Sequence, residues 1–160
     1  MRMLDARDFE EWAAIHMDFE AVRFTARTQM TRLDAWRHFA GFVGHWHLCG
    51  FGMWGVEESA TGRLVGRVGF HEPDGWPGFE LAWTIGREFW GKGYATEAAR
   101  AALGFAFNEM GRDHVISLID PQNVRSIAVA ERLGETVEGE AEVGGYRLLI
   151  YGISKEKHDA

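Results

Sequence analysis

The sequence predicts a mixed α/β fold, in which a single sheet of about six to seven strands is flanked by four helices. Three observations predict it. Apolar residues recur at helical spacing in four segments, three β-rich runs follow one another with turn residues between them, and a helix, an apolar run and a second helix precede a final hairpin. The chain has 160 residues, 46% of them hydrophobic, so residues 1–160 are expected to form one domain with its own core.

Two helices are expected at the start of the chain. Asp8 can cap a helix that runs to about Met17. Thr31, with an aspartate three residues later, can cap a second helix that runs to about Leu48. A first strand over residues 1–4 is possible but short.

Three strands in an antiparallel meander are expected next, over residues 51–57, 64–71 and 79–85. The first two flank the turn residues 59–62, which end in glycine. The segment 73–78 holds two prolines and two glycines and forms the second turn.

The second half of the chain is expected to alternate between helix and strand. A stripe of alanines and larger apolar residues predicts a helix from about residue 94 to Gly111. The nearly continuous apolar run 114–119 is typical of a strand buried on both faces. Asn123 can cap a helix that ends at Gly134. Two last strands, 136–142 and 146–154, pair across Gly144-Gly145.

The most informative segment is the loop 90–93 (Trp-Gly-Lys-Gly), which follows the strand ending at Ile85 and runs into a helix. Its two glycines let the main chain turn tightly and come close to a bound group. The first amides of a helix have no partner within it, and the helix dipole places its positive end there. Strand, glycine loop and helix start together predict a phosphate or pyrophosphate site.

Two nucleotide-binding motifs fit this loop poorly. Residues 86–92 match G-x-x-x-x-G-K, but the next residue of that motif is a magnesium-holding Ser or Thr, and here it is Gly93. A dinucleotide site needs a third glycine and alternating βαβ units, whereas three consecutive antiparallel strands are expected before this loop.

Two segments of the chain resemble the GNAT acyltransferases. That family carries acetyl-CoA on a strand–loop–helix whose loop has the form Q/R-x-x-G-x-G/A, and residues 90–95 occupy it here. Residues 123–126 (Asn-Val-Arg-Ser), followed by Leu133-Gly134, resemble its N-x-x-S/A helix. The resemblance covers nearly the whole chain and implies an acetyl-CoA-dependent N-acetyltransferase. The run 90–98 looks most like the branch that acetylates the N-termini of ribosomal and other proteins and small amines.

The resemblance also implies which residues hold the cofactor. The pantetheine arm pairs with the main chain of the strand before the loop, and the pyrophosphate lies on the loop and the helix start. The implied cofactor-binding residues are Trp83, Thr84, Ile85, Trp90, Gly91, Lys92, Gly93, Tyr94, Ala95, Thr96 and Asn123.

Three positions depart from the family pattern. Trp90 replaces the Gln or Arg of the loop, so the pyrophosphate must rely on main-chain amides, helped by Lys92. Ala130 stands where many members have a tyrosine that protonates the departing thiolate. Glu135 replaces the usual aromatic residue after the helix-ending glycine, which is expected to loosen the packing there.

Glu80 is the first candidate for the catalytic base. It shares a strand face with Ala82 and Thr84, so its carboxylate can face a narrow cleft, where burial would raise its pKa. The alternative is an ordinary ion pair or a solvated side chain. His71, at the end of the preceding strand, is the reserve candidate, although a histidine there is more often a turn residue.

Asn123 and Ser126 lie one helical turn apart, on one face of the expected helix. Asn123 can act as a helix cap alone, and the resemblance also lets it touch the pantetheine or the substrate. Because Ala130 has no hydroxyl, Ser126 becomes the candidate proton donor to the thiolate. Simple packing is the alternative for Ser126.

Composition narrows the setting. The net charge of −7 argues against a nucleic-acid partner. The single cysteine, Cys49, fits a reducing cytoplasm, the N-terminus does not resemble a signal peptide, and no apolar run is long enough for a membrane span. His45 and His47 do not have the spacing of metal ligands on one helix, so no metal is expected.

Other functions remain open at the level of sequence. The chain can instead be a catalytically inactive CoA-binding sensor or scaffold, or a phosphate-binding protein unrelated to CoA. The acceptor of an active enzyme can be a protein N-terminus, a polyamine, an amino acid or an antibiotic. The second helix commonly lines the acceptor pocket in the family, and a homodimer through the last strands is plausible by analogy.

Overall fold

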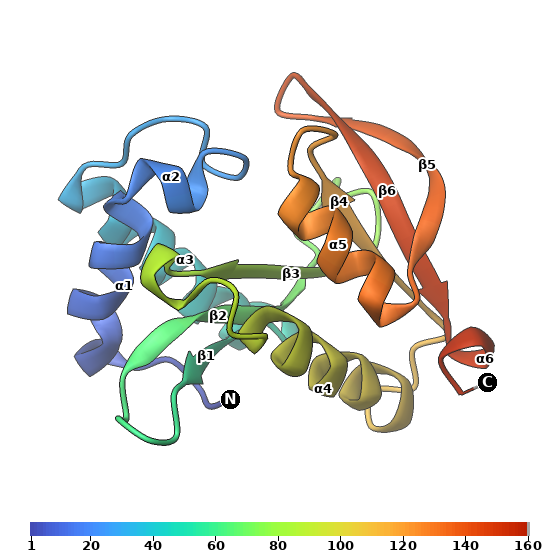
Figure 1. Cartoon of the computed structure of the whole chain (residues 1–160), viewed down its shortest axis with the longest axis horizontal. Helices are drawn as coiled ribbons and strands as arrows, with labels where there is room; N and C mark the ends of the chain where they lie inside the picture. The colour runs from blue at the N-terminus through green and yellow to red at the C-terminus, as the bar shows by residue number, and fades with distance from the viewer. Residues whose placement is uncertain (160) are drawn as a thin grey trace.

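A computed structural model describes residues 1–159 (Figure 1). The helices in this part of the chain are α1 (Phe9–Met17), α2 (Phe19–Val22), α3 (Arg32–Cys49), α4 (Tyr94–Asn108), α5 (Val124–Leu133) and α6 (Lys155–His158). The strands are β1 (Met53–Glu57), β2 (Leu64–His71), β3 (Glu80–Ile85), β4 (His114–Ile119), β5 (Thr136–Val143) and β6 (Tyr146–Ser154). Short 3₁₀ turns, Ala6–Asp8 and Arg87–Phe89, precede α1 and the glycine loop.

The strands form a mixed sheet in the order β1-β2-β3-β4-β6-β5. All neighbours are antiparallel except β3 and β4, which are parallel. This confirms the predicted mixed α/β fold and the four longer helices. The one-turn helices α2 and α6 were not expected, and the possible strand over residues 1–4 is reduced to a single bridge between Arg2 and Gly55.

Most of the predicted helix ends are confirmed by their caps. Thr31 and Asp34 form a capping box at the start of α3, and Asn123 accepts a hydrogen bond from the Ser126 amide at the start of α5. Two details differ. The Asp8 carboxylate makes no cap bond to α1, because it binds Arg2 and the Asp5 amide instead. Helix α4 ends at Asn108, before the predicted Gly111.

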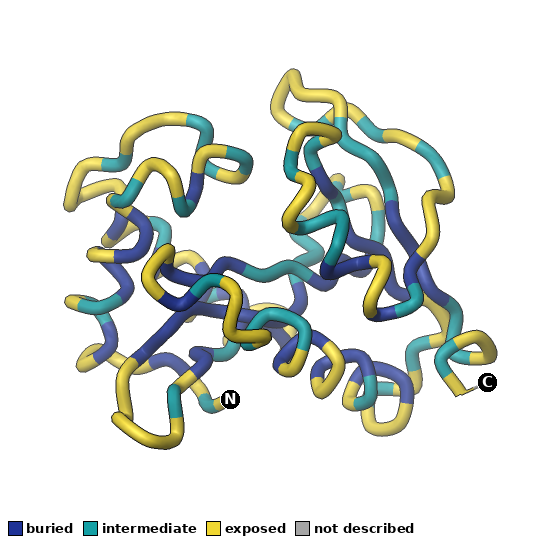
Figure 2. The backbone as a smooth tube through the Cα atoms, in the orientation of Figure 1, coloured by how far each residue is buried: buried dark blue, intermediate teal, exposed yellow. Residues whose placement is uncertain are grey.

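Helices cover both faces of β1–β3. Helix α4 packs on one face, where its alanines and Leu103 join Val68, Leu81 and Phe107 in the largest apolar cluster. Helices α1 and α3 cover the other face, with Trp12 and Phe39 buried there. Strand β2 is buried along almost its whole length, as the dark path through the centre of Figure 2 shows. The strands β1–β3, which lead to the glycine loop, are therefore packed between helices on both faces.

The parallel strands β3 and β4 separate soon after they meet. Their single register pair in the described chain is Glu80 with Ile116, where the Ile116 amide donates to the Phe79 carbonyl at 3.0 Å. One residue further on, Ser117 Oγ donates to the Leu81 carbonyl at 2.9 Å, so a side chain completes the pairing. Beyond this point β4 pairs with β6 alone, and a wedge opens between β3 and β4 (Figure 1).

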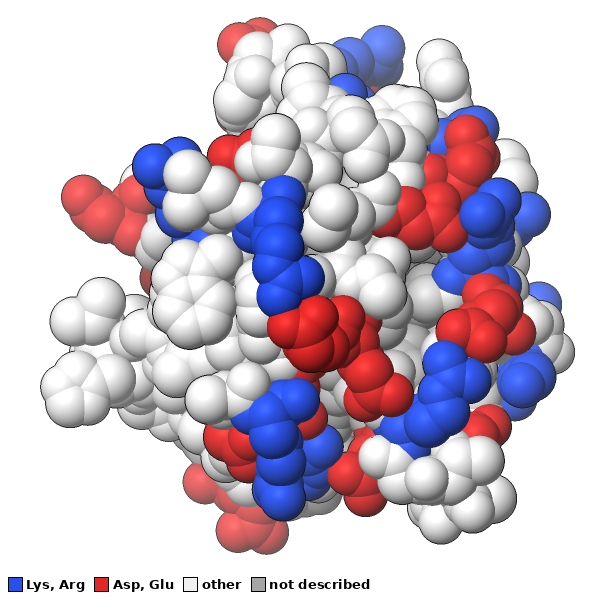
Figure 3. Space-filling view, turned by 90° about the vertical axis from the view of Figure 1, so that its left-hand side faces the viewer, with Lys and Arg blue, Asp and Glu red and all other residues white. Residues whose placement is uncertain are grey.

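Charges of both signs lie side by side on the surface. On the face shown in Figure 3, basic and acidic side chains alternate rather than gather by sign. Ion pairs account for much of this pattern, such as Arg63 with Glu88 and Arg87 with Asp18. Within residues 1–159 no helix combines the length and apolar character that crossing a bilayer requires.

Candidate functional site

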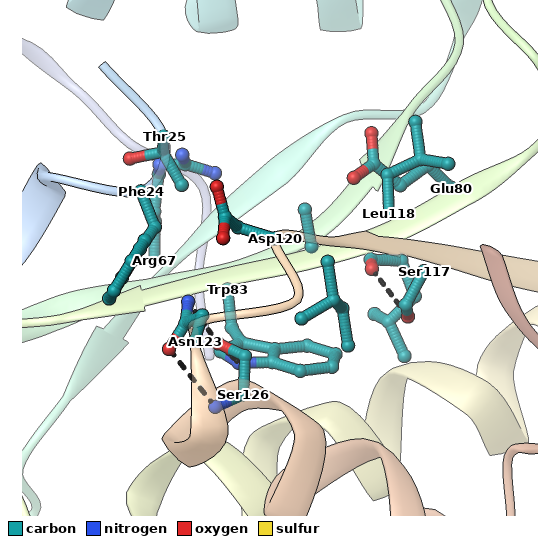
Figure 4. A pocket seen from close by; sticks show the side chains of 13 residues that line it. Phe24, Thr25, Arg67, Glu80, Trp83, Ser117, Leu118, Asp120, Asn123 and Ser126 are labelled. Carbon is teal, nitrogen blue, oxygen red and sulfur yellow. Dashed lines mark hydrogen bonds between the residues drawn. The ribbon is translucent and has the colours of Figure 1, made fainter. Parts of the chain in front are cut away.

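A cleft occupies the wedge between β3 and β4 (Figure 4). Its walls come from the two strands, from the start of α5, from the segment after α2 and from one residue of β2. The lining residues that carry polar side chains are Thr25, Arg67, Glu80, Ser117, Asp120, Asn123 and Ser126, together with the indole of Trp83. Helix α3 contributes no lining residue, contrary to the expectation for the second long helix.

The glycine loop lies just beyond the end of β3. Gly91 and Gly93 have φ of 76° and 86°, a left-handed conformation that glycine adopts without strain. Gly93 takes the N-cap position of α4 without any side-chain cap, and the first helical bond is from the Glu97 amide to the Gly93 carbonyl. The amides of Tyr94, Ala95 and Thr96 therefore have no acceptor among the described residues. Such an end suits an anion.

In β3, Trp83 is the residue whose main-chain groups are free to bind a ligand. The Gly86 amide donates to the Val65 carbonyl of β2. Because the main-chain groups of successive residues point to opposite edges of a strand, the N–H and C=O of Thr84 also point toward β2. Trp83 faces the gap beside β4 and has no partner across it within residues 1–159. The Ile85 carbonyl faces the same way but accepts from Trp90 Nε1 at 2.8 Å. Of the three residues expected to bind pantetheine, the geometry favours Trp83.

Two cations flank the glycine loop. Arg125 extends from the first turn of α5, and its guanidinium carbon lies 3.9 Å from the centroid of the Trp90 ring. Lys92 Nζ lies 5.2 Å from the Phe89 ring. Neither side chain forms an ion pair among the described residues. Arg125 had not been singled out from the sequence, because only the fold brings α5 next to this loop.

Glu80 is buried in the cleft, with 7% of its surface exposed. Trp76 Nε1 donates to its Oε2 at 2.7 Å. Burial raises the pKa of Glu80 to about 7, although the Trp76 hydrogen bond, the charge of Arg67 and the Leu118 amide act in the opposite direction. A carboxyl group with such a pKa can exchange a proton near neutral pH.

His71 lies opposite Glu80 in the β2–β3 register but does not line the cleft. Its ring packs edge-on against Trp76, with centroids 5.0 Å apart, and its buried Nδ1 has no partner among the described residues. Burial lowers the pKa of His71 to about 4, so the imidazole is neutral at pH 7. In this position the His71 ring contacts Trp76, the residue that donates a hydrogen bond to Glu80.

The Ser126 hydroxyl lies at the α5 side of the cleft. Its oxygen accepts from Asn123 Nδ2 at 2.9 Å and from Trp83 Nε1 at 3.3 Å, as Figure 4 shows. Because both contacts use the oxygen as acceptor, the hydroxyl proton is left to be donated elsewhere, and no acceptor for it lies among the described residues. Ala130, one turn further along α5, is fully buried beside Tyr151.

Glu135 does not loosen the packing at the end of α5, as had been expected. Its side chain is 2% exposed and meets Ser117 Oγ at 3.1 Å. Burial raises the pKa of Glu135 to about 8, so at pH 7 it is mostly protonated and can donate to the Ser117 oxygen. Ser117 in turn donates to Leu81, which links Glu135 to the point where β3 and β4 separate.

Two further charged residues, one in the cleft and one beside it, were not predicted from the sequence. Arg67 is a buried cation within an otherwise apolar strand, and that isolated charge was a usable signal. Arg27 forms an ion pair of 2.8 Å with Asp120, which lines the cleft. Its φ of 61° is unusual for a residue other than glycine, and nothing in the sequence indicated it. No cluster of three metal-ligating side chains lies within residues 1–159.

Comparison with known proteins agrees with this geometry. An acetyltransferase from Agrobacterium tumefaciens str. C58 has the same fold, with a TM-score of 0.86 at 28% identity over 96% of this chain and 89% of that one. RimJ of Mycobacterium smegmatis, in complex with CoA-disulfide, is similar in fold, with a TM-score of 0.80 at 19% identity over 97% of this chain and 81% of that one.

Sequence relatives match over shorter stretches. The spermidine N(1)-acetyltransferase of Escherichia coli (strain K12) is 36% identical over 56 residues, which are 35% of this chain and 30% of that protein. The chain spans about half the length of the curated relatives it matches. The acetyltransferase (GNAT) domain matches residues 1–136, which include the β3–β4 cleft, the glycine loop and the start of α5. The chain therefore belongs to the acetyltransferase (GNAT) domain family.

Proposed function

We propose that this protein is an acetyl-CoA-dependent N-acetyltransferase that moves an acetyl group to a primary amine by direct attack on the thioester. One observation carries the proposal: a single wedge has uncapped helix amides near one end, a free strand edge along its side and a buried carboxyl with a pKa near neutrality within it. Acetyl transfer to an amine needs a binding group, an alignment surface and a base in this arrangement.

The cofactor fits the residues at the loop. The open space around Gly91 and Gly93 leaves room for a pyrophosphate at the first turn of α4, and no side chain competes for its amides. Arg125 and Lys92 supply positive charge that Trp90 cannot, and the free edge of Trp83 orients the pantetheine arm. When bound, acetyl-CoA supplies an activated acetyl thioester.

Glu80 acts as the base in this proposal. An amine arrives as an ammonium ion at neutral pH, and it must lose a proton before it can attack a carbonyl carbon. A carboxylate with a pKa near 7 can accept that proton, directly or through a water molecule, while Trp76 fixes its orientation. His71 lines no part of the cleft and contacts Trp76, so it stays the reserve candidate for the base.

Ser126 delivers a proton to the departing thiolate, directly or through a water molecule, and a proton from solvent restores its hydroxyl. Asn123 and Trp83 both donate to its oxygen, which leaves its O–H free to donate to a group in the cleft. Both donated hydrogen bonds also stabilise negative charge on that oxygen. An unchanged turnover in Ser126→Ala would remove the hydroxyl from this role.

The wider setting of the enzyme is also proposed. The acceptor class comprises protein N-termini and small amines, and the name of the spermidine N(1)-acetyltransferase places that relative among the enzymes for small amines. One domain over residues 1–160, a cytoplasmic location and a homodimer through the last strands remain predictions of the sequence. Neither metal ions nor nucleic acid have a part in the proposed reaction.

Release of CoA against a library of amines and peptides, followed by thiol detection, tests the proposal. Amine-dependent release of CoA is the expected result. Tight binding of acetyl-CoA with no release in the presence of any amine would instead favour the sensor or scaffold function. A rise in melting temperature with ATP or NAD but not with CoA would show that the loop serves another phosphorylated ligand.

A further inference from the structure

The floor of the cleft holds a buried arginine. Arg67 lies in the middle of β2, is 5% exposed, and lines the cleft with its side chain. Its neighbours along the strand are apolar residues and glycines, so no solvent-facing pattern accounts for a guanidinium there. Removing a cation from water costs free energy unless an anion or a set of hydrogen bonds compensates for it.

The guanidinium has few partners within the protein. Its Nε donates to His16 Nε2 at 3.4 Å, its Nη1 contacts Met53 Sδ at 3.4 Å, and the group lies 4.5 Å from the centroid of the Phe42 ring. His16 donates from Nδ1 to the Trp12 carbonyl, and burial holds its pKa well below the ordinary value, so it is a neutral acceptor. Within residues 1–159, no carboxylate lies within 4.0 Å of Arg67.

Arg67 and Glu80 face the same cleft from neighbouring strands. The register pairs Arg67 with Thr84 and His71 with Glu80, and residues two apart on a strand share a face, so both side chains are on one side of the sheet. In Figure 4 they stand at opposite ends of the cavity view, with Arg67 beside Thr25 and Glu80 beside Leu118. The cleft thus places a cation at one position and a base at another, without direct contact between them.

We propose that the acceptor is a small amine that also carries a carboxylate, as an amino acid does, with its amine directed to Glu80 and its carboxylate bound by the Arg67 guanidinium. This inference rests on the proposed acetyl transfer and specifies its acceptor. The planar fork of N–H donors on arginine matches a carboxylate in shape and charge. The bound carboxylate supplies an anion in direct contact with Arg67, whereas the Glu80 carboxylate acts on this guanidinium only from beyond ion-pair distance.

The same arginine disfavours two other acceptor classes. A polyamine brings further positive charge into the cleft, which the guanidinium repels in a site of low dielectric constant. The first residue of a peptide has an amide in place of the carboxylate, and this leaves the Arg67 charge uncompensated. Free amino acids therefore fit the cleft better than polyamines or peptide N-termini.

Matched acceptors and variants test the inference. For each amino acid, the rate of CoA release is compared with that of its carboxamide and of the amine without the carboxyl group. We expect kcat/KM to be about 10- to 100-fold higher for the acid, the range for a hydrogen-bonded charge pair. In Arg67→Gln this ratio should fall by a similar factor relative to the wild-type protein, whereas Arg67→Lys should keep part of it. The ratio is insensitive to a changed Glu80 pKa, because all three acceptors share that base.

Arg112→Gln is the matched control. The Arg112 guanidinium lies 4.0 Å from the Phe79 ring and lines no part of the cleft, so the same chemical change there should preserve the ratio. Circular dichroism and the melting temperature show whether each variant is folded. Should Arg67→Gln fail to fold, the acid-to-amide ratio of Arg67→Lys and of the wild-type protein still decides the question.

A binding measurement separates the two proposals. Calorimetry in the presence of CoA should detect amino acids but not their amides. CoA release with plain amines, together with no binding or turnover of any acid, would overturn the carboxylate inference and leave the acetyl transfer standing. Binding of acids that Arg67→Gln abolishes, with no CoA release from acetyl-CoA for any amine, would refute the transfer and keep the anion site.

Discussion

The guanidinium of Arg125 stacks on the indole of Trp90, 3.9 Å from the ring centroid. Trp90 is itself fixed by the bond from its Nε1 to the Ile85 carbonyl, so it forms a platform that holds the cation beside the glycine loop. The family motif places a polar or charged residue at position 90. In the proposed cofactor site, Trp90 positions Arg125 and the guanidinium supplies the charge.

Arg125→Gln should weaken CoA binding about 3- to 10-fold, the range for an exposed cation facing a phosphate. Calorimetry with CoA gives the dissociation constant. Inhibition by pantetheine, which lacks the pyrophosphate, should be unaffected. Arg132→Gln, on the same helix, is the control and should match the wild type. Equal CoA affinity in both variants would exclude Arg125 from the phosphate site.

Glu80→Gln should lower kcat by about 10²- to 10⁴-fold, since it removes the base and preserves an acceptor for Trp76. The active form of Glu80 is the carboxylate, so wild-type kcat should rise as pH increases through about 7. The variant should lose that rise. Glu72→Gln, outside the cleft, should keep both the rate and the profile. An unaltered profile in Glu80→Gln would assign the base to another group.

Much of the fold and part of the site followed from local patterns. The caps at Thr31 and Asn123, the glycine loop and the two faces of β3 each depend on residues close in sequence, and the structure has them at those positions. The alternation along β3 placed Glu80 on a face with small neighbours. Such features are predictable because the physical cause lies within a few residues of the effect.

The remaining features of the site depend on contacts between distant segments. Arg125 reaches Trp90 only because α5 packs beside the loop, and Arg27 meets Asp120 across 93 positions of sequence. The direction of the Thr84 main chain depends on the register with β2, which alternation alone does not fix. Glu135 looked like a packing defect because its partner, Ser117, lies on another strand.

Gly93→Ala should destabilise the protein and impair CoA binding together. An alanine at a φ of 86° costs about 1 kcal/mol or more, although no atom lies within 4 Å of the added methyl group. Gly104→Ala, in the middle of α4 with equally open space, should instead stabilise by roughly 1 kcal/mol and leave binding unchanged. Chemical denaturation measures the free energy of unfolding of both variants. Equal effects at the two positions would contradict the role of loop conformation.

Glu135 should make stability fall as pH rises. Its pKa is raised from 4.5 to about 8 on folding, so its contribution is complete below about 4.5 and is lost as pH rises through 8. From this group we expect a loss of unfolding free energy on the order of 3 kcal/mol between pH 5 and pH 8. Glu135→Gln should abolish this pH-dependent loss of unfolding free energy, whereas Glu131→Gln, at an exposed position, should leave it in place. Identical pH slopes in the two variants would refute the buried neutral carboxyl.

A crystal structure with bound CoA tests the central claim most directly. We predict pyrophosphate oxygens within hydrogen-bonding distance of the amides at the first turn of α4, with the pantetheine arm beside the free main chain of Trp83. Its thiol should end between Glu80 and Ser126. CoA bound away from the β3–β4 wedge, or with its phosphates remote from residues 91–96, would contradict the account.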